Sequence, residues 1–304
     1  MRKTVLIFGV SSFLGSNLVE ALGQDYRIVG TYNSTPVKVP GMLTIRCDVL
    51  KKETVQRLVA LFKPQITIYA GGMSSLTACH ANPKLSDALN SAGLSNVCSS
   101  AERVGSKFIF VSSSFVLSGE DVLYQESDTP FPGTSYGSSL ASSEFYVQKS
   151  CLNYIIFRSC PLYGRGFHPM RRNWFEPIEI ALAQGQQVGV DDTVLHGHLD
   201  VHILAKLMKL GIEKNVTNRL FQITSKDIMS RYDFARLYCQ LFGKDENLVV
   251  RAQWSLPLDN SQYRSKTLEK YNFRMDTKNA EEFFSLRMPT VEESLKATRK
   301  RLTS

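Results

Sequence analysis

The stretch from Thr4 to Leu18 constrains the fold of this 304-residue chain more than any other stretch. It opens with four apolar residues, Val5 to Phe8, that do not alternate with polar ones, a pattern typical of a strand buried on both faces. Gly9 follows directly, and leucines at helical spacing begin beside Gly15. Strand, glycine turn and helix in this order predict a dinucleotide-binding crossover, with a pyrophosphate at the helix N-terminus.

The glycine turn is an incomplete fingerprint. Ser12 stands where a middle glycine is usual, so the spacing alone also fits a tight turn between a core strand and a core helix. Its position in the chain and the pattern that follows favour the binding turn. The residues expected to contact the cofactor there are Gly9, Ser11, Ser12, Phe13, Leu14 and Gly15.

Composition excludes several classes of protein. No apolar run reaches the length of a membrane span, and the chain enters a strand at once rather than a signal sequence. The six cysteines lie far apart without a CxxC pair, which indicates reduced core thiols, no metal site and a cytoplasmic location. The formal charge of +8 is spread along the chain, which indicates a solvated surface rather than a nucleic-acid partner.

Strand and helix patterns alternate through the first half of the chain. This alternation predicts an α/β fold with a doubly wound parallel sheet and right-handed crossovers. The expected strands after the first one are 26–32, 43–46, 65–69 and 107–112, and the expected helices are 52–62 and 83–104.

The ends of these strands indicate which dinucleotide binds. The second strand runs into Tyr32, Asn33 and Ser34 without an acidic residue, and Lys38 follows. A carboxylate there would hold the ribose hydroxyls of NAD and repel the 2′-phosphate of NADP, so the sequence favours NADP, with NAD as the alternative. Further cofactor contacts are expected from small or polar residues at later strand ends, namely Asp48, Val49, Ala70, Gly71 and Gly72.

Motifs in the second half carry a family resemblance. They are Phe110 to Gly119, Ser135-Tyr136-Gly137, Arg158 to Arg165, Ser230 to Phe242, Met275 to Lys278 and Pro289 to Leu295. Together with the N-terminal glycines and Asp48, the chain resembles the extended short-chain dehydrogenase/reductase superfamily, and within it the dTDP-4-dehydrorhamnose reductase branch, over nearly its whole length. The resemblance implies a Rossmann domain over 1–165, completed by about 192–224. It also implies a smaller lobe, 166–191 and 225–304, closing over a nucleotide-linked sugar.

The resemblance also implies a catalytic site. Tyr136 matches the tyrosine that exchanges a proton with the substrate oxygen, and Ser113 matches the hydroxyl that holds that oxygen. The lysine usual four residues after the tyrosine is replaced by Leu140. Ser112 and Pro161 are the remaining cofactor residues. The residues expected to bind substrate are Ser114, Arg165, Arg171, Arg172 and Trp174.

The missing lysine leaves three functions open. The first is an NADP-dependent reductase of a nucleotide-linked keto sugar. The second is a non-catalytic member of the fold, a nucleotide or sugar-nucleotide sensor or a partner subunit. The third, an epimerase or dehydratase, is disfavoured because Ser114 stands where an acid is expected. A homodimer is compatible with each. His196, His198 and His202 are expected to be solvated or to face a partner, since no cysteine or acidic cluster completes a metal-ligand set.

Overall fold

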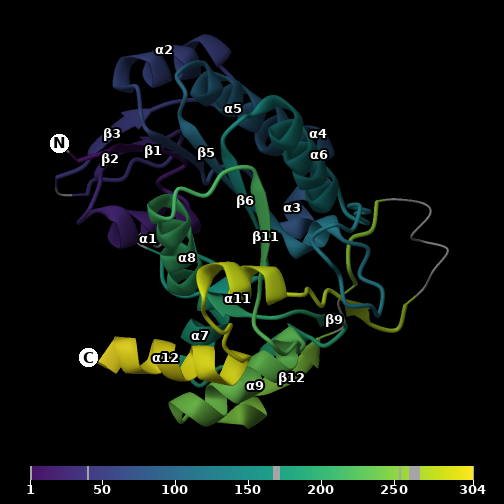
Figure 1. Ribbon diagram of the computed structural model, residues 1–304. Coiled ribbons are helices and arrows are strands. Elements are labelled where there is room, and N and C mark those ends of the chain that lie inside the picture. Colours follow the sequence, from purple (N-terminus) through teal and green to yellow (C-terminus); the bar gives the residue numbers. More distant parts are fainter. Residues whose placement is uncertain (1, 40, 167–171, 253–254, 260–267, 304) are drawn as a thin grey trace.

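The computed structural model describes residues 2–39, 41–166, 172–252, 255–259 and 268–303. Within this part of the chain, seven strands form one parallel sheet in the order β11-β6-β5-β4-β1-β2-β3 (Figure 1). They are β1 (Thr4–Phe8), β2 (Arg27–Tyr32), β3 (Leu43–Arg46), β4 (Ile66–Tyr69), β5 (Lys107–Ser113), β6 (Tyr154–Ser159) and β11 (Arg219–Ile223). The predicted doubly wound α/β fold is therefore confirmed.

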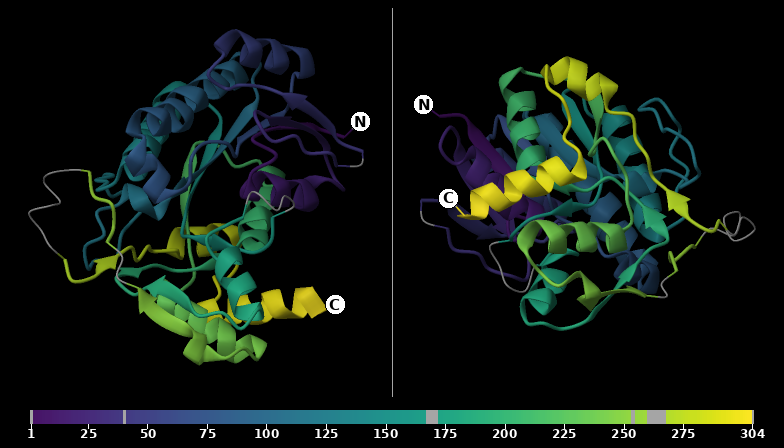
Figure 2. Two further views of the ribbon diagram at one scale, coloured as in Figure 1. Left: turned by 180° about the vertical axis from the view of Figure 1, so that it is seen from behind. Right: turned by 90° about the horizontal axis from the view of Figure 1, so that it is seen from below.

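Helices cover both faces of this sheet. Helices α1, α8 and α11 lie on one face, and α2, α5 and α6 lie on the other (Figures 1 and 2). Their bounds are α1 (Phe13–Leu22), α2 (Lys52–Phe62), α5 (Gly93–Arg103), α6 (Ser135–Ser150), α8 (Val201–Glu213) and α11 (Lys278–Phe284). The predicted helix over 83–104 is composite, because α4 (Pro83–Asp87) and α5 are joined by a π-helical turn, Ala88–Ala92.

The switch in strand order lies beside β1. All five β1 residues are buried, as the apolar run predicts, and β1 pairs with β2 on one side and β4 on the other. The chain thus winds outward in both directions from β1. In such sheets a crevice forms at the carboxyl ends of the strands near this point, which is where ligands bind.

A second, smaller apolar core lies beyond those strand ends. It is built largely by α7 (Glu176–Ala183), α9 (Arg231–Phe242), α12 (Val291–Thr303) and the strand pair β8 (Val188–Asp191) and β12 (Val249–Ala252). Phe273 and Phe284 instead pack into the larger core. The remaining short elements are α3 (Leu76–Ala81), β7 (Leu162–Tyr163), β9 (Val194–Leu195), β10 (Leu199–Asp200), β13 (Tyr271–Asn272) and the 3-10 helices Ser114–Val116 and Glu246–Leu248. The lobe boundaries stay a prediction.

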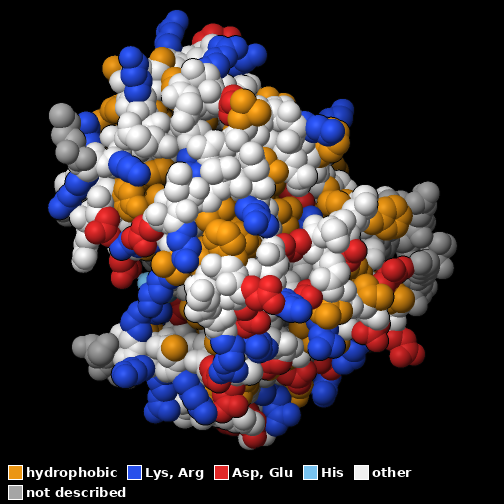
Figure 3. Space-filling view, in the orientation of Figure 1, with side chains coloured by type: hydrophobic (Ala, Val, Ile, Leu, Met, Phe, Trp, Pro, Cys, Tyr) orange, Lys and Arg blue, Asp and Glu red, His pale blue; other side chains and the backbone are white. Residues whose placement is uncertain are grey.

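The surface carries mixed charge. Figure 3 shows basic and acidic side chains interspersed on this face, most densely over the smaller lobe. None of the helices described is long and apolar enough to cross a bilayer. All six cysteines are buried and unpaired.

Asp200 connects α8, which covers the main sheet, to α12 of the smaller lobe. It caps α8 by accepting a hydrogen bond from the His202 amide at 2.9 Å, and it also accepts hydrogen bonds from Thr298 and Arg301 of α12. Burial alone would raise the pKa of this carboxyl, but the hydrogen bonds from His202, Arg301 and Thr298 outweigh burial and lower the pKa to about 2.

We expect Asp200→Asn to lower the free energy of unfolding at pH 7 by about 2 kcal/mol, the equivalent of the pKa shift. A depressed carboxyl pKa stabilises the fold above the unfolded value, 3.8, and this contribution disappears as the pH falls through about 2. Denaturant titrations at descending pH measure it. Asp25→Asn, which removes an exposed ion pair with Lys209, is the control and should cost under about 1 kcal/mol. A deficit that persists unchanged into acid would contradict this role.

Candidate functional site

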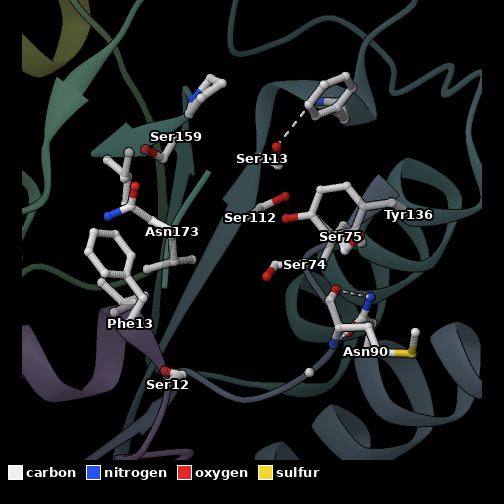
Figure 4. A pocket seen from close by; sticks show the side chains of 18 of the residues that line it. Ser12, Phe13, Ser74, Ser75, Asn90, Ser112, Ser113, Tyr136, Ser159 and Asn173 are labelled. Atoms are coloured by element: carbon white, nitrogen blue, oxygen red, sulfur yellow. Dashed lines mark hydrogen bonds between the residues drawn. The ribbon is translucent and has the colours of Figure 1, made fainter. Parts of the chain in front are cut away.

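The carboxyl ends of β4, β5 and β6 open into a cavity of about 490 Å³ between the sheet and the smaller lobe. Figure 4 shows Ser12 and Phe13 at one side of it and Ser112, Ser113 and Tyr136 across from Asn173. Many of the residues expected at the site line this cavity: Ser12, Phe13, Leu14, Ala70, Gly71, Gly72, Ser112, Ser113, Tyr136, Pro161, Arg172 and Trp174.

The glycine turn after β1, the loop after β4 and the first turn of α1 approach one another closely. Gly9 has a φ of +87°, and a Cβ added there would lie 2.6 Å from Gly71. A Cβ added at Gly15 would lie 2.3 Å from the Gly9 carbonyl oxygen. Ser12 caps α1 by accepting a hydrogen bond from the Gly15 amide at 2.9 Å, so the unusual serine strengthens the helix start. The Gly15 amide is thus taken by the cap, and the amides of Phe13 and Leu14, which have no intrahelical acceptor, are left to fit a pyrophosphate.

Tyr136 lies in the first turn of α6, as predicted, with Thr134 as the N-cap. Ser113 is the last residue of β5, and its side chain lies on the same side of the cavity (Figure 4). Burial raises the pKa of Tyr136 to about 12, although a hydrogen bond with Ser113 acts in the opposite direction. The phenol is therefore protonated at neutral pH, which suits a proton donor and not a base. The neighbouring Ser112 hydroxyl is buried without a partner among the described residues.

Leu140 occupies the turn above Tyr136. It is buried, and its side chain lines the cavity where a lysine is usual in the superfamily that the chain resembles. Among the described lining residues there is no lysine from any other element. A buried ion pair holds this helix to the sheet: Arg158 of β6 donates two hydrogen bonds to Glu144, at 3.1 and 2.7 Å.

Asn90 is a site residue that sequence reasoning missed. Its side chain accepts a hydrogen bond from the Met73 amide at 2.7 Å and donates to the Met73 carbonyl at 3.0 Å and to Ser139 at 2.9 Å. Gly72 has a φ of +103°, and a Cβ there would lie 2.2 Å from the Asn90 oxygen. Asn90 thus fastens the loop after β4 to α6. Its place in a π-helical turn, a frequent mark of functional sites, has no signature in the sequence.

The predicted substrate residues fall in different places. Arg172 and Trp174 line the cavity, and Arg171 lies outside the described residues. Arg165 does not line the cavity, because it pairs with Glu179 at 3.0 Å in an exposed position. Ser114 does not line it either, because its fully buried hydroxyl lies 3.3 Å from the His196 ring. Arg231 of α9 lines the cavity and was missed.

The other predicted cofactor residues lie along the same edge of the sheet, outside the cavity lining. Thr31 of β2 accepts hydrogen bonds from the amides of Gly9 and Val10, so the strand that leads into Tyr32, Asn33 and Ser34 ends beside the turn. The β3 register sets Arg46 opposite Tyr32. Ser11 and Gly15 belong to the turn itself. Asp48 and Val49 follow β3, where the Asp48 carboxylate accepts a hydrogen bond from the Leu50 amide at 3.0 Å.

The prediction of solvated histidines is wrong for two of the three. His196 and His198 are buried, and each packs against aromatic rings, His196 on Phe273 and His198 on Trp174. Desolvation lowers the pKa of His198 to about 3 and also lowers that of His196. Both are therefore neutral, which a loop sequence cannot reveal because the rings that bury them come from distant segments. His202 is half-buried beside Asp200.

A glycine turn at the switch point of a parallel sheet, with a tyrosine and a serine across the same cavity, defines a doubly wound α/β protein of the dinucleotide-binding class. The chain belongs to the family described as RmlD substrate binding domain, whose model matches residues 2–304. This confirms the resemblance to the dTDP-4-dehydrorhamnose reductase branch.

Individual relatives are distant. A dTDP-4-dehydrorhamnose reductase of Aggregatibacter actinomycetemcomitans is 22% identical over 303 residues, covering 97% of this chain and 98% of the relative. Methionine adenosyltransferase 2 subunit beta of Rattus norvegicus is 26% identical over 164 residues, 53% of this chain. The match spans about half the length of that relative, 48%.

A solved structure shares the fold over the whole chain. It is the dTDP-4-dehydrorhamnose reductase of Bacillus anthracis in complex with NADP, with a TM-score of 0.82 and 20% identity, covering 99% of this chain and 100% of the other. Other similar structures were solved with NAD.

Proposed function

We propose that this protein is an NADP-dependent reductase of a keto group in a nucleotide-linked sugar. One observation carries the proposal. Tyr136 and Ser113 line the same cavity as the start of α1, so a dinucleotide laid along the glycine turn would end beside two hydroxyls suited to a carbonyl oxygen. Relatives named for such a reduction, one of them similar over its whole length, support this choice of substrate class.

The roles of the residues follow from their chemistry. The amides of Phe13 and Leu14 at the start of α1 would hold the pyrophosphate, because those of Gly9, Val10, Ser12 and Gly15 already donate hydrogen bonds within the chain. The dinucleotide, when bound, supplies the hydride. Tyr136 would donate its proton to the substrate oxygen, since its raised pKa keeps it protonated. Ser113 would hold that oxygen by a hydrogen bond, and Asn90 would keep the loop of Gly71 and Gly72 in place.

Leu140 makes the proposed reaction slow. If a lysine normally lowers the tyrosine pKa by a few units, its loss removes roughly 3–4 kcal/mol of phenolate stabilisation, on the order of 10²–10³ in rate. Reduction needs the protonated phenol and suffers less from this loss than oxidation does. The clamp on the cofactor ribose would still be missing, and with it some positioning of the hydride.

A second candidate is a binding or regulatory subunit without turnover. Leu140 favours it, since a leucine cannot hold a ribose hydroxyl, and one relative is named as a subunit of another enzyme. The reductase remains the better proposal, because tyrosine and serine are both retained at one cavity.

We expect calorimetric titration to give clearly tighter binding of NADPH than of NADH. Residues 32–39, from the last residue of β2 onward, include no acid, and Lys38 and Arg46 supply positive charge nearby. Arg46→Glu should reverse or abolish the preference, whereas Arg27→Glu, at the opposite, amino end of β2, should not. Tighter binding of NADH by the unaltered protein would contradict the choice of NADP, and binding of neither would overturn the reductase proposal.

The proposal extends to the cellular compartment, the substrate lobe and the oligomeric state of the protein. The six buried, unpaired thiols support a reducing compartment, and we propose the cytoplasm. The separate apolar core of α7, α9 and α12 supports a substrate lobe drawn from about 166–191 and 225–304. A homodimer is compatible with this arrangement.

A further inference from the structure

The charge of the cavity wall is one-sided. Among the described lining residues, Arg172 and Arg231 are the only ones with a charged side chain, and both are cations. No aspartate or glutamate of the described lining offsets them. A cavity lined by one sign of charge concentrates ligands of the opposite sign, so the wall of the smaller lobe suits an anionic group.

Among the residues that the structure describes, none supplies Arg231 with a counter-charge of its own. No carboxylate of a described residue lies within 4.0 Å of its guanidinium, and the acid that acts on it from further away is Asp191. That carboxylate already accepts hydrogen bonds from the Thr193 amide at 2.9 Å and the Thr193 hydroxyl at 2.6 Å. Desolvation lowers the pKa of Arg231. Arg231 is half-buried, so its charge is partly withdrawn from water, an unfavourable state that an anionic ligand would relieve.

Trp174 lies against this guanidinium. The Arg231 group lies 4.8 Å from the centre of the Trp174 ring, a distance at which the cation is attracted to the aromatic face. The indole itself is packed between Phe175, His198 and Phe234, with ring centres 5.2–5.4 Å away. A guanidinium is planar and presents its donors as a fork, which matches two oxygens of a phosphate or a carboxylate.

Two other arginines of this region, which do not line the cavity, pair with carboxylates instead. Arg165 pairs with Glu179 at 3.0 Å. Arg236, one and a half turns further along α9, pairs with Glu246 at 3.0 Å. The neighbouring histidines add no charge at neutral pH, because the pKa of each is lowered.

We propose that Arg231, held against Trp174, binds an oxyanion of the substrate and so determines which substrates the cavity accepts. The inference rests on the proposed function for its ligand: in a nucleotide-linked sugar the oxyanion is the diphosphate, and in a sugar acid it would be a carboxylate.

Binding experiments without the dinucleotide test this role. We would titrate the protein with dTDP and UDP, with thymidine and uridine as probes that lack phosphate, and with glucuronate as a free carboxylate. Arg231→Gln should weaken the binding of one nucleoside diphosphate at least tenfold and leave the binding of the nucleoside unchanged. Arg231→Lys, which keeps the charge and loses the fork, should fall in between. Arg236→Gln, the same change on the same helix away from the cavity, should bind as the unaltered protein does.

Thermal melting without ligand separates binding from structure. Because Arg231→Gln removes a half-buried charge without a carboxylate partner, its melting temperature should stay the same or rise. A clear drop would mean a structural role and would overturn the inference. Equal affinity of the Gln variant and the unaltered protein for dTDP, UDP and glucuronate would also overturn it. A loss confined to glucuronate would identify a carboxylate as the anion and uphold the role of Arg231.

These outcomes are independent of turnover. Diphosphate binding that depends on Arg231 in a protein that does not bind NADPH would uphold this inference and refute the reductase. NADPH-dependent reduction whose KM for the sugar nucleotide is unchanged in Arg231→Gln would uphold the reductase and overturn this inference.

Discussion

Tyr136→Phe should reduce NADPH-dependent reduction of dTDP-4-dehydrorhamnose by at least about a hundredfold. Removing one hydroxyl takes away the proton donor at the keto oxygen, and general acid catalysis contributes about 10²–10⁴ to such rates. The change keeps the ring, so packing against Phe115, 6.1 Å away between ring centres, is retained. We therefore expect kcat to fall while the affinity for NADPH stays within about twofold.

A matched control is available on the same helix. Tyr146→Phe removes a hydroxyl from a partly buried tyrosine of α6 that does not line the cavity, and it should leave the rate unchanged. If Tyr136→Phe turned over as fast as the unaltered protein, the chemistry would not depend on this phenol and the proposed site would be wrong.

Leu140→Lys should raise the reduction rate tenfold or more, which corresponds to about 1.4 kcal/mol of transition-state stabilisation. The new ammonium would lie one helical turn from Tyr136, where residues four apart share a face. There it would lower the phenol pKa from about 12 and offer a hydrogen bond to the ribose of the cofactor. The pH at which the rate changes should shift downward in parallel.

Two comparisons isolate the effect of the charge. Leu140→Met keeps volume and adds no cation, so its rate should match that of the unaltered protein. Leu140→Lys combined with Tyr136→Phe should show no gain, because the ammonium acts through the phenol. A gain that persists without Tyr136 would point to a different proton donor. No gain in the single variant, with folding and NADPH binding intact, would mean that the charge at this position is not what limits the rate.

The first half of the fold could be predicted because its signals are local. The apolar run of β1 and the amphipathic pattern of α2, whose bounds are Lys52–Phe62 as expected, depend on residues a few positions apart. The serine at position 12, where a glycine is usual, could be noted from the sequence, but its structural role could not be predicted. Its role as a helix cap depends on the conformation of the turn.

The parts of the site that could not be predicted depend on contacts between distant segments. Asn90 is recognisable as a site residue only when Met73 and Ser139 meet it. Arg231 looks like an ordinary residue at the start of a helix until Trp174 and the cavity are seen beside it. Arg165, by contrast, has the right residue type in the right motif, but Glu179 holds it away from the cavity.

The most direct test of the central claim is hydride transfer itself. NADPH carrying deuterium at its transferable position is incubated with dTDP-4-dehydrorhamnose and the protein, and the sugar product is analysed by mass spectrometry. This readout accumulates over time and detects the slow reaction that Leu140 implies. The account predicts a product that carries one deuterium from the cofactor and forms far more slowly with Tyr136→Phe. A protein that binds both ligands yet yields no deuterated product above the protein-free blank would contradict it.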